Sequence, residues 1–333
     1  MSDPAVLVGS GPAGHVRPWP VVLVHGTRTS HSQWDPQVPA LRAAGHHVLT
    51  PDLPGHGARR GEPFTLEAAQ AVIEGAARTA HEATALPVHL VGGSLGGMLA
   101  IRSAARLGAA DRADAGTDRA GASPVLGSLV ACGAAVRPTP LTARLYARLI
   151  TATDLLPAMR RGSEDFPFTW ALGREGARAY LRGGRADNDV VAPAFAAVAS
   201  LDLRGELSRI PAPVTFLHGR FERLRLHERS FTAAAPQGRL EPLPYGNHML
   251  NLVRAERFTP DLRASSPAPS DRRAPGRPRT GTGPSLVPCT TPPCASASCP
   301  ASSPTASCAA GSPAAATPGS SSSPSRCPAR RRR

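Results

Sequence analysis

Short apolar runs alternate with helix-forming stretches along residues 19–131. Four of these runs are rich in β-branched residues and bounded by Gly or Pro, which predicts buried strands over residues 21–24, 47–53, 88–91 and 125–131. The stretches between them have helix-forming composition, at residues 36–44, 65–83 and 95–107. Strict alternation of strand and helix predicts an α/β fold, a mostly parallel, doubly wound sheet with helices on both faces.

The alternation is interrupted in the second half of the chain. Residues 108–123 are small and polar and are expected to form a solvated insertion, and residues 134–200 are mainly helical. The alternating pattern then resumes, with a strand at 214–217, a helix at 224–235 and a strand at 239–243. The helical insertion at 134–200 is therefore a candidate lid over the carboxyl end of the sheet.

The composition changes abruptly at Ala264. Residues 264–333 contain 14 Pro and 15 Ser but no aromatic residue, so they cannot bury enough apolar surface to offset the entropy of ordering. We expect an N-terminal segment at 1–19, one folded domain at 20–263 and a disordered tail at 264–333. An out-of-frame reading of a G+C-rich gene is a second interpretation of the tail.

The strong positive charge is mostly a property of that tail. All 38 basic residues are Arg, and of the net charge of +14 the tail carries +8. The tail has no aromatic side chain on which a base could stack, and the rest shows no basic helix, so no nucleic-acid partner is expected.

No apolar stretch approaches the roughly 20 residues that cross a bilayer, and the first eight residues do not resemble a secretory signal. We expect a cytoplasmic protein with no membrane partner.

Neither a cofactor nor a metal ion is predicted. Gly9, Gly11 and Gly14 match the spacing of a dinucleotide-binding turn, but Pro18 and Pro20 exclude the helix which that motif requires. Five of the six cysteines lie in the tail without a Cys-x-x-Cys pair, so they match no zinc pattern. The remaining cysteine, Cys132, lies in an apolar run and is interpreted as a small core residue.

A candidate nucleophile follows the third predicted strand. Residues 92–96 read Gly-Gly-Ser-Leu-Gly and stand between the apolar run VHLV and a helix-forming stretch. A tight turn between strand and helix tolerates only Gly around the serine and lifts its Oγ above the sheet edge. Ser94 would then lie at a helix N-terminus, where backbone N–H groups can stabilise an oxyanion.

Together with two further segments, this motif resembles the α/β-hydrolase family across residues 20 to about 262. LVHGTRTSHSQW, at 23–34, resembles its oxyanion loop, and DLPGHG, at 52–57, resembles the loop after the next strand. The resemblance implies that Thr27 and Leu95 supply the N–H groups of the oxyanion hole. It also implies that His248, in YGNHMLNL, is the general base.

The acid of the triad departs from the family pattern. The family usually has Gly-x-x-Asp after the corresponding strand, whereas this chain has Gly219-Arg220-Phe221-Glu222, so Glu222 is the candidate. Its extra methylene moves the carboxylate by about 1 Å, which would lower the rate unless the loop compensates. Three neighbouring arginines are expected to compete for it: Arg220, Arg223 and Arg225. The fallback acids are Glu228 and Asp202.

Other residues are assigned to structural roles or left open. His25 and His56 belong to family motifs, and His218 ends a strand, so all three are interpreted as structural. Aromatic residues cluster in the helical insertion, where they either pack the lid or line an apolar pocket: Phe166, Phe168, Trp170 and Tyr180. The last helix, over residues 250–258, is expected to be curtailed by Pro260, leaving apolar surface open.

The leading hypothesis is a cofactor-free serine hydrolase acting on a small-molecule carboxylic ester, thioester or lactone. Ser94 would attack the carbonyl, His248 would carry the proton and Glu222 would orient His248. The alternative is a catalytically impaired binding protein of the same fold, motivated by Glu222 and the short final helix. A third interpretation is a nucleic-acid-binding protein that works through its tail.

Overall fold

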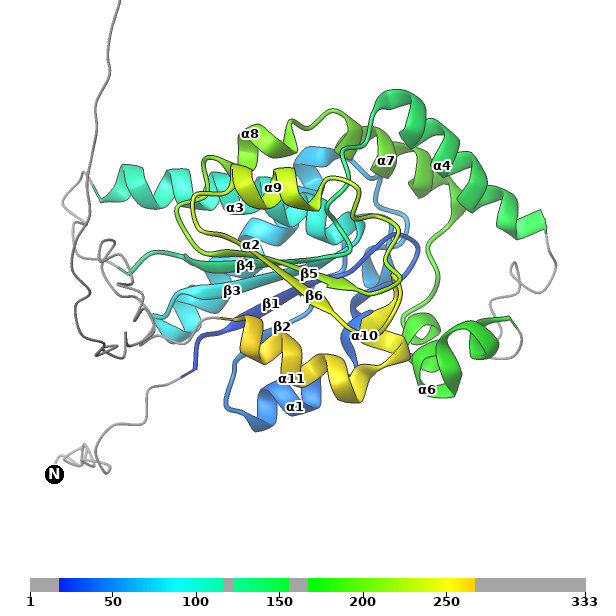
Figure 1. Cartoon of the computed structure of the whole chain (residues 1–333), viewed down its shortest axis with the longest axis horizontal. Coiled ribbons are helices and arrows are strands. Elements are labelled where there is room, and N and C mark those ends of the chain that lie inside the picture. Colours follow the sequence, from blue (N-terminus) through cyan, green and yellow to red (C-terminus); the bar gives the residue numbers. More distant parts are fainter. Residues whose placement is uncertain (1–17, 116–122, 156–166, 267–333) are drawn as a thin grey trace, which may run out of the picture. The chain divides into compact units, whose positions relative to one another are not determined.

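A parallel six-stranded sheet lies at the centre of the part of the chain described by the structure, a computed structural model that covers residues 18–115, 123–155 and 167–266 (Figure 1). The strands are β1 (Val21–Val24), β2 (Val48–Leu49), β3 (Val88–Gly93), β4 (Leu126–Cys132), β5 (Val214–Gly219) and β6 (Gly238–Leu243). Their order across the sheet is β2-β1-β3-β4-β5-β6, and every neighbouring pair is parallel. The predicted α/β class is confirmed, although the strand expected at 47–53 shortens to two residues.

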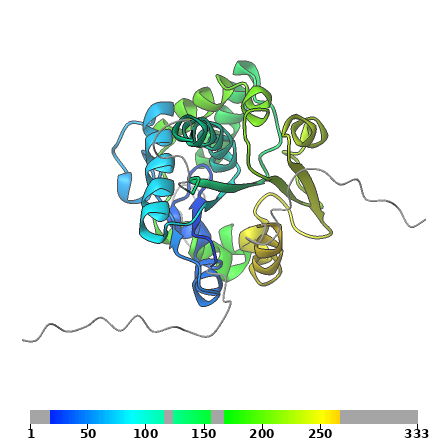
Figure 2. The same ribbon diagram turned by 90° about the vertical axis from the view of Figure 1, so that its left-hand side faces the viewer.

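Helices cover both faces of this sheet. They are α1 (Val38–Ala43), α2 (Leu66–Thr84), α3 (Leu95–Asp114), α4 (Pro140–Ala152), α6 (Phe168–Arg182), α7 (Val191–Ala199), α8 (Leu203–Leu207), α9 (Glu228–Ala234), α10 (Leu250–Val253) and α11 (Ala255–Ser265). Figures 1 and 2 show α2, α3 and α9 against one face and α1 and α11 against the other. The sheet is therefore doubly wound, as a strictly alternating sequence requires.

The strands bury successive residues on opposite faces. In β1, Val22 and Val24 belong to the core under α2 and α3, whereas Val21 and Leu23 belong to the core under α1 and α11. Since side chains alternate along a strand, a sheet covered on both faces needs apolar residues at every position. This requirement explains why the strands appear in the sequence as uninterrupted apolar runs.

Helix α3 is longer than the sequence predicts. It continues to Asp114, so residues 108–114 of the expected solvated insertion are helical. Asp111, in the added part of the helix, accepts hydrogen bonds from the N–H groups of Val125 and Leu126, at 2.9 and 3.1 Å. These contacts hold the start of β4 against the end of the helix.

The final helix is also longer than expected, and the prediction that Pro260 curtails it is wrong. Helix α11 runs through Pro260 to Ser265, two residues beyond the expected end of the domain. Proline removes one backbone hydrogen bond from the helix. Phe258 and Leu262, one turn apart, offset this loss because both are fully buried against the sheet.

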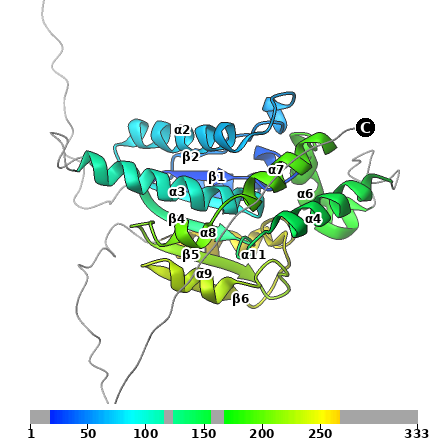
Figure 3. The ribbon, with the colours of Figure 1, turned by 90° about the horizontal axis from the view of Figure 1, so that it is seen from above.

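The segment between β4 and β5 holds α4, α6, α7 and α8. Figure 3 shows α4, α6 and α7 gathered at one end of the sheet, and α4 packs along α7. Of the aromatic residues singled out in this segment, Phe168 is buried and stacks on Tyr180 at a ring separation of 5.6 Å, whereas Trp170 is exposed. Phe166, the dinucleotide-like glycines and almost all of the predicted tail lie outside the described residues.

No helix among the described residues is long and apolar enough to cross a membrane.

One histidine is buried within the sheet, where the cost of charging it is high. His89, in β3, is 3% exposed, with its Nδ1 2.7 Å from the Ser128 hydroxyl and its ring against Trp19. Burial, and then the nearby His46, lower the pKa of His89 to about 3. The unfolded chain takes up this proton below its ordinary pKa of 6.5, whereas the folded protein does not until about pH 3.

We therefore predict that the free energy of unfolding falls as pH decreases from 6.5 towards 3. One such group contributes a slope of up to about 1.4 kcal/mol per pH unit. Urea unfolding of the His89→Gln variant between pH 6.5 and 4 should show a shallower slope than the unsubstituted protein. The exposed His47→Gln is the matched control. Equal slopes in all three proteins would contradict the assignment.

Candidate active site

Ser94 stands between the end of β3 and the start of α3, as predicted. Its backbone has φ 54° and ψ −120°, a conformation that is costly for a residue with a side chain. The Ser94 N–H donates to the carbonyl of Cys132, at 2.8 Å, which holds the turn against the neighbouring strand. The turn therefore directs the serine away from both regular elements.

Two glycines permit this tight turn. A Cβ atom on Gly96 would lie 2.3 Å from the carbonyl oxygen of His25, and one on Gly92 would lie 2.4 Å from the carbonyl oxygen of Gly96. Real side chains do not approach this closely, so any other residue would push the first turn of α3 away from the ends of β1 and β3. The sequence requirement for glycine at these positions is thus steric.

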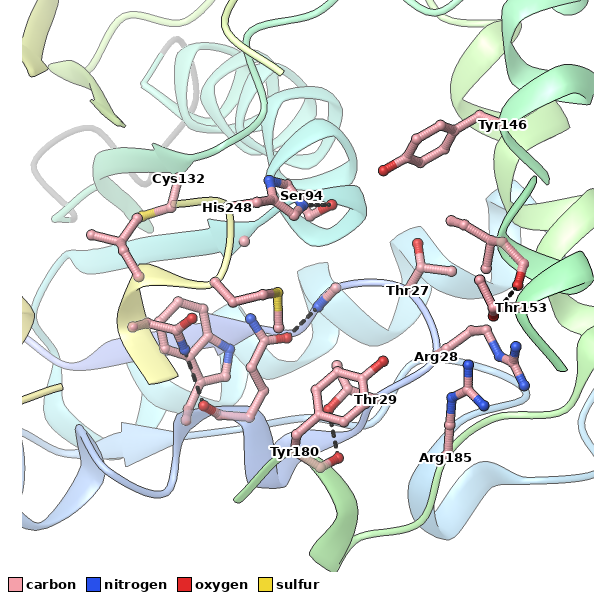
Figure 4. A pocket seen from close by; sticks show the side chains of 18 of the residues that line it. Thr27, Arg28, Thr29, Ser94, Cys132, Tyr146, Thr153, Tyr180, Arg185 and His248 are labelled. Atoms are coloured by element: carbon pink, nitrogen blue, oxygen red, sulfur yellow. Dashed lines mark hydrogen bonds between the residues drawn. The ribbon is translucent and has the colours of Figure 1, made fainter. Parts of the chain in front are cut away.

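The structure brings Ser94, His248 and Glu222 together in one hydrogen-bonded chain. His248 Nε2 lies 3.0 Å from Ser94 Oγ, and His248 Nδ1 lies 2.8 Å from Glu222 Oε2 (Figure 4 draws Ser94 and His248). These residues come from loops after β3, β5 and β6, whose carboxyl ends meet at the same edge of the sheet. Side chains 154 residues apart in the sequence therefore make direct contact.

The two loops that carry Glu222 and His248 are hydrogen-bonded to each other. The N–H groups of Arg220 and Phe221 donate to the carbonyls of Tyr245 and Gly246, both at 3.0 Å. Because β5 and β6 are adjacent and parallel, these bonds extend their pairing beyond the sheet. The distance between the carboxylate and the imidazole is consequently set by backbone contacts.

Glu222 is 5% exposed and accepts two hydrogen bonds. Besides the contact with His248, its Oε1 accepts the N–H of Leu224 at 2.6 Å. Burial alone would raise the pKa of this carboxyl group, but the hydrogen bonds from His248 and Leu224 and the nearby imidazoles outweigh burial and lower it. The carboxylate is therefore charged and oriented at neutral pH.

Gly133 makes room for the longer acid, and sequence analysis did not identify it. It follows β4 with φ 55°, and a Cβ atom there would lie 2.6 Å from Glu222 Oε2 and 3.0 Å from His248 Nδ1. The extra methylene of glutamate is thus accommodated where another residue would occupy the space. A single glycine after a predicted strand carries no signal that distinguishes it from an ordinary turn residue.

The expected competition from neighbouring arginines does not occur. Among the described contacts Glu222 has no arginine partner, because Arg225 pairs with Glu228 at 2.9 Å and Arg220 lies over the ring of Phe221. The fallback acids serve elsewhere. Glu228 is held by that ion pair, and the side chain of Asp202 caps the N-terminus of α8.

Among the described residues, the loop after β1 presents the backbone N–H of Thr27 without a partner. The N–H of Gly26 donates to Gln33 Oε1 at 2.7 Å, and that of Arg28 donates to His56 Nε2 at 3.3 Å. The N–H of Thr27, between them, has no hydrogen-bond partner within the described part of the chain, and neither has that of Leu95 at the start of α3. The two predicted oxyanion donors are therefore free to bind a ligand.

The other candidate residues support the loops. His25 accepts the N–H of Leu53 at 3.0 Å, and burial with the neighbouring His56 lowers the pKa of His25 to about 3, so it is neutral. His218 is fully buried in β5, and burial lowers its pKa. Cys132 is buried in the core, where burial and Glu222 raise the pKa of its thiol to about 12. Such a thiol is not a nucleophile at neutral pH.

A cavity of about 230 Å³ opens beside Ser94 (Figure 4). Its walls come from the oxyanion loop, from α10 and from the segment between β4 and β5, which contributes Tyr146, Tyr180, Arg185 and Phe195. Sequence analysis had singled out only Tyr180 of these four. Arg28 and Arg185 also face the cavity, and an arginine in a loop carries no sequence signal that separates it from an exposed one.

Solved structures with similar folds include a lactonase and an esterase. The enol-lactonase from Burkholderia xenovorans LB400 has a TM-score of 0.53 and 24% identity, covering 77% of this chain and 93% of that one. A thermophilic esterase from Thermogutta terrifontis has a TM-score of 0.57 and 22% identity, covering 74% and 88%. At such identities these structures show a shared fold.

Sequence relatives extend the comparison. An AB hydrolase superfamily protein of Gibberella zeae is 36% identical over 81 residues, 24% of this chain, and the match spans only 28% of that protein's length. The profile of the family described as "Alpha/beta hydrolase family" matches residues 21–261, which include β1 to β6 and the loops that hold Ser94, Glu222 and His248. The chain therefore belongs to the alpha/beta hydrolase family.

Proposed function

We propose that this chain is a serine hydrolase that cleaves a small carboxylic ester, thioester or lactone through an acyl-enzyme. The observation that carries the proposal is the hydrogen-bonded chain from Ser94 through His248 to Glu222, with distances of 3.0 and 2.8 Å. A serine hydroxyl is a weak nucleophile unless a base within hydrogen-bond reach takes its proton. Here the base is in reach and is itself oriented by a buried carboxylate.

The reaction proceeds in two halves. Ser94 Oγ attacks the carbonyl carbon while His248 Nε2 accepts the hydroxyl proton, and the carbonyl oxygen becomes an oxyanion bound by the N–H groups of Thr27 and Leu95. The intermediate collapses, and His248 returns the proton to the leaving alcohol, thiol or lactone oxygen. Water then attacks the acyl-enzyme with the same proton transfers and regenerates Ser94.

Glu222 keeps the imidazole in the productive tautomer. When the Nδ1–H of His248 donates a hydrogen bond to the carboxylate, Nε2 carries no proton and is free to accept the proton of Ser94. The carboxylate also stabilises the imidazolium that forms during each half-reaction. Since the pKa of Glu222 is lowered, it stays an acceptor throughout.

The cavity supports a substrate of modest size. A volume of about 230 Å³ lies below the range of roughly 300–1,000 Å³ that is common for small-molecule sites. The lactonase and the esterase whose folds resemble this one make an ester or lactone the favoured substrate class. In this proposal residues 134–200 act as the lid, because α4, α6 and α7 supply much of the wall facing Ser94.

Labelling with a fluorophosphonate tests the nucleophile. We expect one covalent adduct per chain on Ser94, found by mass spectrometry of the digested protein, because only a serine activated by a base reacts rapidly. Ser94→Ala should not be labelled, and the control Ser200→Ala should be labelled as the unsubstituted protein is. Absence of an adduct on folded protein, or its presence on another serine, would reject the proposal.

Replacing the acid tests the role of Glu222. Glu222→Gln should lower kcat on a p-nitrophenyl ester by about 10³–10⁴-fold, because a neutral amide neither selects the tautomer nor stabilises the imidazolium. The control is Glu228→Gln, which removes the carboxylate at the start of α9 that is paired with Arg225. Similar rates for both variants would mean that another group orients His248.

Gly133→Ala tests the space beside the acid. The added methyl group would contact Glu222 Oε2 and would strain a backbone with φ 55°, so we expect kcat to fall about 10²-fold with a smaller change in KM. The matched control is Gly75→Ala in α2, where a Cβ atom meets open space and alanine favours the helix. Unchanged kcat in folded Gly133→Ala would contradict the steric argument.

A further inference from the structure

The end of the cavity beyond Thr27 is built from two guanidinium groups. Arg28 and Arg185 line the same cavity as Ser94, and Figure 4 shows them apart from Ser94, with Thr27 between in this view. Arg28 is 5% exposed, and its backbone has φ 61°, held by the contact of its N–H with His56. An arginine is seldom buried without an anion, so its partners decide what this end of the cavity is for.

One carboxylate serves both arginines. Arg28 Nη2 and Arg185 Nη1 donate to the two oxygens of Asp154, each at 2.7 Å. Burial alone would raise the pKa of Asp154, but the hydrogen bonds and charges of Arg28 and Arg185 hold it below its ordinary value, so the carboxylate is ionised. Both of its oxygens are therefore already used, one by each guanidinium.

Arg28 keeps one hydrogen-bond donor that has no partner among the described residues. Arg28 Nε donates to the carbonyl of Ala186, but its Nη1 is buried and has no hydrogen-bond partner. Thr27 Oγ1, in the residue before Arg28, is buried in the same way. No Asp or Glu stands among the described residues that line the cavity. Buried donors left unpaired are costly, and charged ones most of all, so this end is complementary to an acceptor that the chain does not itself provide.

We infer that the substrate carries a carboxylate, which Arg28 and Arg185 bind at the end of the cavity away from Ser94. A guanidinium binds a carboxylate with charge-assisted hydrogen bonds, and two guanidinium groups that share the single carboxylate of Asp154 keep a net positive charge that a second carboxylate would balance. The preferred substrate is then an ester, thioester or lactone of a dicarboxylic or hydroxy-dicarboxylic acid with one acid group free. This inference rests on the proposed function only for the placement of the ester at Ser94.

Binding to the Ser94→Ala variant tests the carboxylate site without turnover. The ligands are monomethyl esters of four-, five- and six-carbon dicarboxylic acids, each paired with the methyl ester whose free acid is replaced by a carboxamide. Calorimetry should give a Kd at least about tenfold lower for the acid than for its amide at the best-fitting length. Equal affinities at all three lengths would overturn the inference.

Two substitutions test whether the arginines cause the preference for the acid over its amide. In the Ser94→Ala background, Arg28→Met should remove the preference for the acid, whereas the control Arg182→Met, which removes an exposed arginine paired with Asp35, should leave it. If Arg28→Met does not fold, Asp154→Asn decides, because it keeps both arginines and removes their competing anion. It should tighten binding of the acid about five- to tenfold and leave binding of the amide unchanged. A preference unaffected or weakened by Asp154→Asn, or one that survives Arg28→Met, would overturn the assignment.

The two proposals fail separately. Fluorophosphonate labelling of Ser94 without selective binding of acids would leave the hydrolase and reject the carboxylate site. Selective binding without labelling would leave an anion-binding protein of this fold and reject the hydrolase.

Discussion

The close approach of α3 to the carboxyl ends of β1 and β3 is the contact on which the candidate site depends. Gly92 and Gly96 allow it, and because of it Ser94 adopts a strained backbone at the first turn of the helix. The same approach places the free N–H of Leu95 near the loop that carries Thr27. Backbone strain of this kind costs on the order of 1–3 kcal/mol and persists only where the surroundings enforce it. Here the buried parallel strands on either side supply that constraint.

The acid shows how a departure from a family pattern can be compensated locally. Glutamate in place of the usual aspartate reaches farther, and the structure accommodates it with a glycine at 133 and an N–H donor at Leu224. Arg225 pairs with Glu228 and Arg220 lies over Phe221, and among the described residues the ion-pair partner of Glu222 is His248. The departure that motivated a non-catalytic interpretation is therefore matched by features that keep the acid in contact with the base. The second reason for the non-catalytic interpretation, a curtailed final helix, does not hold, because α11 buries Phe258 and Leu262.

The segment between β4 and β5 gives the cavity its chemical character. The loops at the sheet edge carry the residues that would act on an ester, and the profile of the family covers these loops. The arginine–aspartate cluster of Arg28, Asp154 and Arg185 instead links the oxyanion loop to this segment. In the two proposals, the carboxylate site therefore combines Arg28 of the loop after β1 with Arg185 of this segment, whereas Ser94, Glu222 and His248 come from loops at the sheet edge. A polar cluster of this kind is informative because a buried donor without a partner, here Arg28 Nη1, indicates the chemistry of the missing partner.

The sequence alone determined the α/β class and the sheet strands, because a strand buried on both faces requires an uninterrupted apolar run. It also determined the position of Ser94, because a tight turn between strand and helix requires glycine. His248 and Glu222 followed only from order and resemblance, since nothing local shows which His or Glu will meet the serine. The tertiary structure alone decided that Gly133 makes room for Glu222 and that Arg28 and Arg185 share Asp154. Such contacts join residues far apart in the chain, and they depend on how the strand ends and the inserted helices come together.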